Sequence, residues 1–218
     1  MNNIICLILS LPKSLYWSVK FYGMKGLSCP LLVRYDAIMN VKGRLSPPPK
    51  KNSKKRNKIG FGGSSCVPFG KTIISVSRGG SLFFKGSFIL SEGCIVRIEK
   101  QGVLSLGDNF YANKNCFFSV DKGVSLGDNV LCGWNVQIRD SDGHSVFTNG
   151  VKHANNEEVF IGNHCWLATD VVILKGVRIA NDNIVAFGSR VLKGCETSNN
   201  LLAGFPAKIV KTGVSWMV

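Results

Sequence analysis

Apolar side chains recur at every sixth position through the C-terminal part of the chain. One series consists of branched aliphatic residues throughout, namely Ile161, Leu167, Ile173, Ile179, Val185 and Val191. The residue two positions before each is mostly small or β-branched, as in Val159, Cys165, Val171, Val177, Asn183 and Ser189. A helix repeats at about 3.6 residues and a strand at about 2.0, so neither explains this period. A period of six with one large aliphatic residue per unit is typical of a parallel β-helix built from hexapeptides.

In such a fold each hexapeptide forms one flat face, and three successive hexapeptides close one triangular coil. The aliphatic side chain points into the prism, and the residue two before it fits the corner. Successive coils stack as parallel strands about 4.8 Å apart. The sequence therefore predicts an all-β chain whose core is a column of inward side chains.

The same period is present earlier in the chain, although less regularly. It passes through Leu82, Phe88, Cys94, Lys100, Leu106, Ala112 and Phe118, of which Lys100 is off-pattern, and resumes after a slip of two residues at Leu126, Cys132 and Ile138. Triplets at 107–109, 127–129 and 181–183 combine Gly, Asp and Asn, which tolerate the left-handed backbone that sharp corners need. We expect these triplets at corners of the prism.

The chain divides into three parts. Residues 1–58 lack the period and form an N-terminal basic segment with a helix within Leu15–Leu32, before Pro47, Pro48 and Pro49 break any helix. Residues 59–200 form the β-helix. Residues 201–218 leave it through Gly204 and Pro206 as a tail.

One long interruption separates Ile138 from Ile161, because their spacing of 23 is not a multiple of six. Residues 139–158 must therefore leave the prism as an extruded loop, and loops on rigid scaffolds often carry function. The loop contains His144, and a neutral imidazole can accept a proton from an alcohol near neutral pH. Asp142 or Asp140 could orient the ring. A histidine in a surface loop is more often simply solvated, so the residues alone leave both interpretations open.

Three segments resemble the hexapeptide-repeat acyltransferases, which fold as left-handed β-helices. They are IGNHCWLATDVVILKGVRI from Ile161 to Ile179, SDGHS from Ser141 to Ser145, and LLAGFPAKIVK from Leu201 to Lys211. The SDGHS segment is similar to the catalytic-histidine segment of the branch that O-acetylates capsule, O-antigen and sialic-acid polysaccharides. The resemblance covers residues 70–212 and is more specific for the family than for the acceptor.

This resemblance implies a homotrimer whose active sites lie between neighbouring prisms. His144 would be the general base, with Asp142 beside it, and Trp166 would line the acetyl-CoA cleft and could donate its indole N–H. Packing at a corner is the alternative role for Trp166. By the same resemblance acetyl-CoA would bind along the prism edge at Trp166, Ala168, Ala186, Lys193 and Lys208. The expected reaction transfers acetyl from acetyl-CoA directly to a sugar hydroxyl, without a metal or an acyl-enzyme.

The excess of basic residues indicates that the protein could bind acidic partners. Lys and Arg number 27 against 13 Asp and Glu, for a formal charge of +14. Lys50, Lys51, Lys54, Lys55, Arg56 and Lys58 form a cluster, which is either a solvated loop or a surface for polyanions. No nucleic-acid motif accompanies it, so we expect no nucleic acid. An acidic saccharide acceptor and peripheral contact with an anionic membrane are both compatible with this charge.

The cysteines and the N-terminal residues indicate the compartment of the protein. Eight scattered cysteines without a CxxC pair favour small core residues in a reducing compartment, and the period places Cys165 inward although it adjoins His164. The apolar run Ile4–Leu11 is short of the roughly 20 residues of a membrane span. We therefore expect a cytoplasmic protein, at most on the inner face of the membrane.

Two other enzyme classes remain open. A small acceptor such as serine, maltose, an amino-sugar nucleotide or a xenobiotic would fit the same fold. A zinc enzyme of the related carbonic anhydrase type is disfavoured, because the only histidines, His144, His153 and His164, are spaced 9 and 11 apart.

Overall fold

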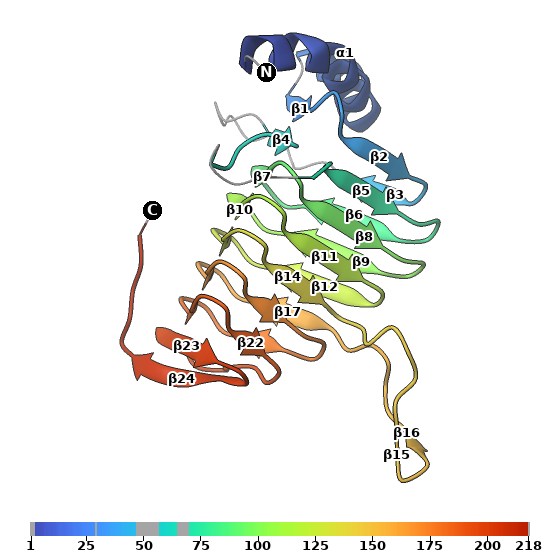
Figure 1. Ribbon diagram of the computed structural model, residues 1–218. Helices are drawn as coiled ribbons and strands as arrows, with labels where there is room; N and C mark the ends of the chain where they lie inside the picture. Colours follow the sequence, from blue (N-terminus) through green and yellow to red (C-terminus); the bar gives the residue numbers. More distant parts are fainter. Residues whose placement is uncertain (1–2, 29, 47–56, 65–69, 218) are drawn as a thin grey trace.

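Three parallel sheets wind around one axis and form a triangular prism (Figure 1). The computed structural model describes residues 3–28, 30–46, 57–64 and 70–217. Each sheet collects one strand from every coil, so neighbours within a sheet are about one coil apart in sequence. This arrangement confirms the β-helix prediction and is consistent with the left-handed form.

Sheet A contains β1 (Leu31–Val33), β4 (Asn57–Ile59), β7 (Phe88–Leu90), β10 (Phe110–Ala112), β13 (Leu131–Cys132), β18 (Trp166–Leu167), β21 (Ile184–Val185), β23 (Asn200–Gly204) and β24 (Ala207–Thr212). Sheet B contains β2 (Ile38–Val41), β5 (Ile73–Val76), β8 (Ile95–Ile98), β11 (Phe117–Val120), β14 (Gln137–Arg139), β19 (Val172–Ile173) and β22 (Arg190–Val191). Sheet C contains β3 (Arg44–Ser46), β6 (Ser81–Phe84), β9 (Val103–Leu106), β12 (Gly123–Leu126), β17 (Val159–Ile161) and β20 (Arg178–Ile179).

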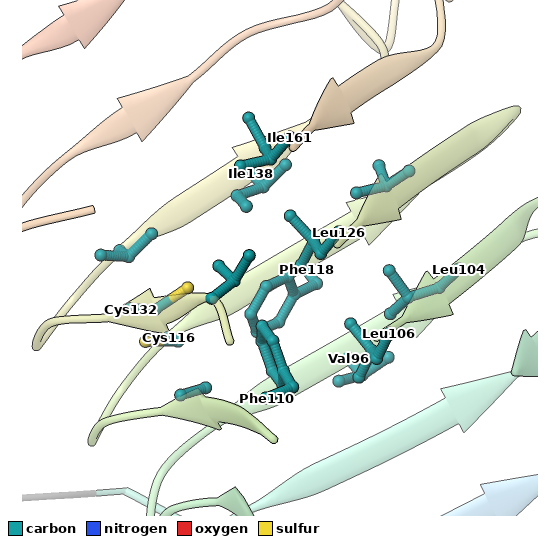
Figure 2. Close-up of a cluster of buried hydrophobic side chains, with 14 of the residues drawn as sticks. Val96, Leu104, Leu106, Phe110, Cys116, Phe118, Leu126, Cys132, Ile138 and Ile161 are labelled. Atoms are coloured by element: carbon teal, nitrogen blue, oxygen red, sulfur yellow. The ribbon is translucent and has the colours of Figure 1, made fainter. Parts of the chain in front are cut away.

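The core is the column of side chains inside the prism (Figure 2). All six aliphatic residues of the series from Ile161 to Val191 are fully buried, and so are Asn183 and Ser189 two positions before the last two. Phe110 and Phe118 meet edge to face with ring centroids 6.1 Å apart and fill the wider middle of the prism. The six-residue period thus reports directly which side chains point inward.

The predicted coil of three hexapeptides holds only after the extruded loop. There Phe160 pairs with Arg178, which lies three hexapeptides further along the chain, whereas Ile95 pairs with Phe117 across a longer coil. The difference arises because strands such as β8 and β9 are longer and bury two side chains each. Lys100 lies in the turn between these strands and is exposed, so it does not interrupt the inward column.

The predicted corner residues adopt left-handed backbone conformations. Asn109, Asn129 and Asp182 have φ values of 54°, 56° and 59°. The side chains also stack between coils, since Asn109 Nδ2 donates to Asn129 Oδ1 at 3.0 Å. Coils pack so closely at Gly107 that an added Cβ would lie 2.2 Å from the carbonyl oxygen of Gly127. Small and amide residues at these corners therefore set the stacking distance.

The N-terminal segment differs from its prediction in extent. Helix α1 spans Asn3–Tyr22 and continues into a 3-10 helix, η1 (Gly23–Ser28), so the helix starts well before Leu15. The strands β1, β2 and β3 already belong to the three sheets, and the prism therefore begins before the predicted boundary at residue 59. Of the basic cluster, only Lys58 lies within the described residues, in β4.

Helix α1 lies across the end of the prism where β1 lies, and β24 lies at the other end (Figure 1). The segment Ile4–Ser28 is long and apolar enough to cross a membrane by length and composition. The short run Ile4–Leu11 is thus part of a longer apolar helix than the sequence pattern indicated. At the opposite end β24 pairs antiparallel with β23 and closes sheet A.

Candidate active site

The extruded loop leaves the prism at one corner. Residues 140–158 connect β14 of sheet B to β17 of sheet C, close to the predicted span of 139–158, and the loop projects away from the prism (Figure 1). Its outer part is a hairpin of β15 (Phe147–Thr148) and β16 (Val151–Lys152). The loop therefore belongs to the edge shared by sheets B and C.

Asp140 fixes the root of this loop. Its side chain is fully buried and accepts backbone N–H groups from Asp121 at 2.8 Å, Lys122 at 2.8 Å and Gly123 at 2.6 Å. These donors form the turn that enters β12, directly beneath the loop. A buried carboxylate that accepts from three backbone donors is an anchor for the backbone, and both of its oxygens are engaged in that role.

Lys175 ties the loop to the next coil. Its Nζ lies 2.5 Å from Asp142 Oδ2 and also donates to the carbonyl oxygen of Ala154 at 2.5 Å. Ser141 and Asn156 form an antiparallel bridge that closes the loop at its base. The two ends of the loop are therefore held together while its outer residues extend into solvent.

His144 lies exposed just beyond this root, next to Gly143, whose φ is +79°. Within the part of the chain that the structure describes, no hydrogen bond joins His144 to Asp140 or Asp142. Both carboxylates that we considered as orienting groups are engaged elsewhere, Asp140 with the backbone and Asp142 with Lys175. His153 is exposed in the same loop, on the far side of the hairpin.

The other predicted site residues gather on sheet A. Trp166 in β18 is half-buried and pairs with Ile184 in β21 of the next coil. Ala168 and Ala186 follow these two strands and therefore lie one above the other, with Ala168 buried. Lys208 is exposed in β24, at the end of the same sheet.

The two groups of residues lie on different parts of the prism. Trp166, Ala168, Ala186 and Lys208 belong to sheet A, whereas His144 projects from the edge between sheets B and C. Lys193 is exposed in the segment that follows β22 of sheet B, and lies toward the edge between sheets B and C. One chain thus places Trp166, Ala168 and Ala186 on adjacent coils, with Lys208 at the end of the same sheet. It brings neither Lys193 nor His144 to them.

The structure adds His164, which the sequence showed only as one of three histidines and as the neighbour of Cys165. Its Nδ1 lies 2.8 Å from Asp182 Oδ1, and its ring stacks on Trp216 with centroids 4.5 Å apart. Trp216 Nε1 donates to the carbonyl oxygen of His164 at 2.9 Å. These residues stand at one end of a groove of about 1000 Å³ along sheet A. No local signal could have paired positions 52 residues apart.

The core positions predicted for the cysteines are confirmed for five of the six that are described, whereas Cys6 is half-buried on α1. Cys94, Cys116, Cys132, Cys165 and Cys195 are buried inside the prism. Burial raises the pKa of the Cys165 thiol to about 11, so the thiol is protonated at neutral pH despite the adjacent His164. Among the described residues no group of three His, Cys, Asp or Glu side chains could hold a metal ion.

Comparison with known proteins finds similar acetyltransferases, although no family model matches the chain. The galactoside O-acetyltransferase of Escherichia coli (strain K12) is 34% identical over 110 residues, which are 50% of this chain and 53% of that protein. The polysialic acid O-acetyltransferase of Neisseria meningitidis is 32% identical over 129 residues, 58% of this chain and 57% of that protein. The chain thus spans little more than half the length of these relatives.

The fold agrees with a solved structure over most of the chain. The crystal structure of the polySia specific acetyltransferase NeuO superposes with a TM-score of 0.59 and 24% identity, and covers 87% of this chain and 89% of that one. The sequence matches and the repeated parallel coils lead to the same assignment. The chain is therefore similar in sequence and in fold to the hexapeptide-repeat acetyltransferases.

Proposed function

We propose that this protein is an acetyl-CoA-dependent O-acetyltransferase that acetylates a sugar hydroxyl of a bacterial surface polysaccharide, either capsule or O-antigen. The observation that carries the proposal is the anchored loop that presents His144 at an edge of a β-helix of this family. The polysialic acid relative favours a polysaccharide acceptor. The excess of positive charge favours an acidic one.

In the proposed reaction His144 accepts the proton of the acceptor hydroxyl as that oxygen attacks the thioester carbonyl of acetyl-CoA. The C–S bond then breaks, and the proton passes from His144 to the departing CoA sulfur. The Trp166 indole N–H or a backbone N–H would stabilise the tetrahedral oxyanion, and one such donor is worth about 3 kcal/mol. Direct transfer needs no acyl-enzyme, in keeping with the buried and protonated Cys165 thiol.

A homotrimer would complete this site. His144 and Trp166 lie on different parts of one prism, so a neighbouring prism has to supply one of them to the other. In a closed ring each prism meets its neighbour head to tail through two different surfaces. The proposed site requires these surfaces to be the edge between sheets B and C and sheet A of the next chain. Ala168 and Ala186 would then line the acetyl-CoA cleft, while Lys193 and Lys208 would contact the CoA phosphates.

A small saccharide is the second candidate acceptor, because the galactoside O-acetyltransferase matches at 34% identity. The first experiment therefore follows CoA release from acetyl-CoA with a thiol reagent, against capsular and O-antigen saccharides, galactosides, maltose and serine. A saccharide-dependent rate for one acceptor is expected. Release driven only by serine would refute the polysaccharide proposal.

The base assignment is tested with two histidine variants of one loop. His144→Ala should lower kcat by roughly a hundredfold or more, the range for loss of a general base. His153→Ala is the matched control, because His153 is equally exposed in the same loop. Equal losses in the two variants would show that loop structure, rather than proton transfer by His144, controls the rate.

The shared site is tested by subunit mixing. His144→Ala and Trp166→Ala chains are each expected to be inactive, and are unfolded, mixed in equal amounts and refolded. If each site takes His144 from one chain and Trp166 from its neighbour, about a quarter of the sites in random trimers are intact. Activity that stays absent in refolded trimers would place both residues of a site on one chain.

A further inference from the structure

Helix α1 is attached to the prism through a row of serines. Ser10, Ser14 and Ser18 are spaced four apart, all three are buried, and they face β1, the terminal strand of sheet A. Ser14 Oγ accepts the N–H of Val33 at 2.9 Å, and Ser18 Oγ accepts that of Leu31 at 3.2 Å. The serines thereby cover the open edge of the sheet with hydrogen bonds.

Lys13 fixes the same face of the helix. Its Nζ donates to the carbonyl oxygens of Tyr35 and Ala37, each at 2.7 Å. Tyr35 also donates its N–H to Ser10 Oγ at 3.0 Å. The polar face of α1 is therefore committed to the prism, and the helix cannot rotate its apolar face inward without leaving these groups unpaired.

The rest of the helix surface is largely apolar and lies in solvent. Its exposed large side chains are Ile4, Ile5, Leu7, Ile8, Leu9, Leu11, Leu15 and Tyr16, followed by Met24 and Leu27 in η1. Only 28% of the most apolar stretch is buried in the protein. The helix thus differs from a helix packed on a protein core, because its serines face the prism and its aliphatic side chains face solvent. An apolar patch this continuous marks an interaction surface.

The charge around this patch identifies the partner. No Asp or Glu precedes Asp36 in the sequence, whereas Lys20 and Lys25 are exposed at the border of the patch. Lys20 Nζ lies 4.6 Å from the ring centroid of Trp17, beside the exposed Tyr16. The helix itself carries no acidic residue, and Asp36, which lines a pocket with Tyr16 and Lys20, is paired with Arg34. Aliphatic residues bordered by aromatic rings and lysines fit the interface of an anionic phospholipid membrane.

We propose that α1 lies in the plane of an anionic phospholipid surface and docks the prism there by its N-terminal end. A membrane-spanning helix would have to break the serine bonds to β1 and the Lys13 bonds to Tyr35 and Ala37, whereas an interfacial helix keeps them. The lysines add electrostatic attraction to anionic headgroups. This proposal concerns a surface remote from the loop and does not depend on the acetyl-transfer proposal.

The test uses the full chain and vesicles, with no acceptor or acetyl-CoA. Co-sedimentation is expected with vesicles of phosphatidylcholine and phosphatidylglycerol, weaker with phosphatidylcholine alone, and weaker again at high salt, which screens Lys20 and Lys25. Ile8→Glu and Leu15→Glu should each lower the partition coefficient by roughly tenfold, because each removes one buried aliphatic side chain from the lipid.

Val103→Glu is the matched control, since Val103 in β9 is 39% exposed and Leu15 is 41% exposed. It should bind vesicles like the parent, and circular dichroism should show all variants folded. Equal binding by the parent and the two α1 variants would overturn the proposal. Resistance of the bound protein to alkaline extraction would also overturn it, because it indicates a membrane-spanning segment. A smaller oligomer mass for Leu15→Glu in the absence of vesicles would overturn it as well, because it indicates that a second copy of the chain covers α1.

Discussion

Replacing Asp140 tests whether the loop root is a structural anchor. Asp140→Asn keeps the shape of the side chain but leaves one acceptor oxygen for three backbone donors. If the amide oxygen takes the Oδ2 position, the N–H groups of Lys122 and Gly123 keep a partner, and the N–H of Asp121 faces an NH₂ group. One partly buried donor is then unpaired, and the other two hydrogen bonds are no longer made to a charged group.

We expect this change to lower the free energy of unfolding by about 3 kcal/mol, from one lost and two weakened charge-assisted bonds. For a chain of this size that corresponds to a fall in Tm of roughly 6–12 °C. Circular dichroism on heating measures the shift. Asp142→Asn is the matched control, because its pair with Lys175 is partly exposed and exposed pairs contribute about 0–1 kcal/mol.

The kinetic readout separates anchoring from proton chemistry. At a temperature where Asp140→Asn is fully folded, its pH–rate profile should keep the shape of the parent, because Asp140 does not contact His144. If Asp140→Asn had the Tm of the parent and a displaced pH–rate profile, the anchoring role would be refuted. Asp140 would then be assigned to orienting His144.

Three further changes follow from packing and burial. Gly107→Ala should lower the free energy of unfolding in urea by several kcal/mol, because its Cβ would lie 2.2 Å from the carbonyl oxygen of Gly127; an unchanged midpoint would show that the coils can separate there. The Cys165 thiol ionises with a pKa of about 9 when unfolded but about 11 when folded. The free energy of unfolding should therefore fall as the pH rises from about 9 to about 11, and that of Cys165→Ala should fall less steeply over the same range. Trp216→Ala should cost about 1–3 kcal/mol through the lost His164 stack and hydrogen bond, and Trp216→Phe should recover only the stacking part; equal losses would assign the whole effect to the N–H bond.

The sequence by itself determined which residues face the core after the loop. All six aliphatic residues of the period from Ile161 to Val191 are buried as predicted, because in a parallel coil the burial of a side chain follows from its position within one short repeat. The same arithmetic located the extruded loop, since a spacing of 23 cannot close whole hexapeptides. The left-handed corners at Asn109 and Asp182 were likewise local properties of the residue type.

Other features were decided only by the tertiary structure. The earlier coils are longer than three hexapeptides because strands such as β8 bury two side chains each, which a fixed period of six misses. The role of Asp140 depends on donors in the turn that enters β12, and the stack of Trp216 on His164 joins positions 52 apart. Local periodicity fixes which way a side chain points, but its partner is set by which coil or terminus the fold brings beside it, and that contact is non-local.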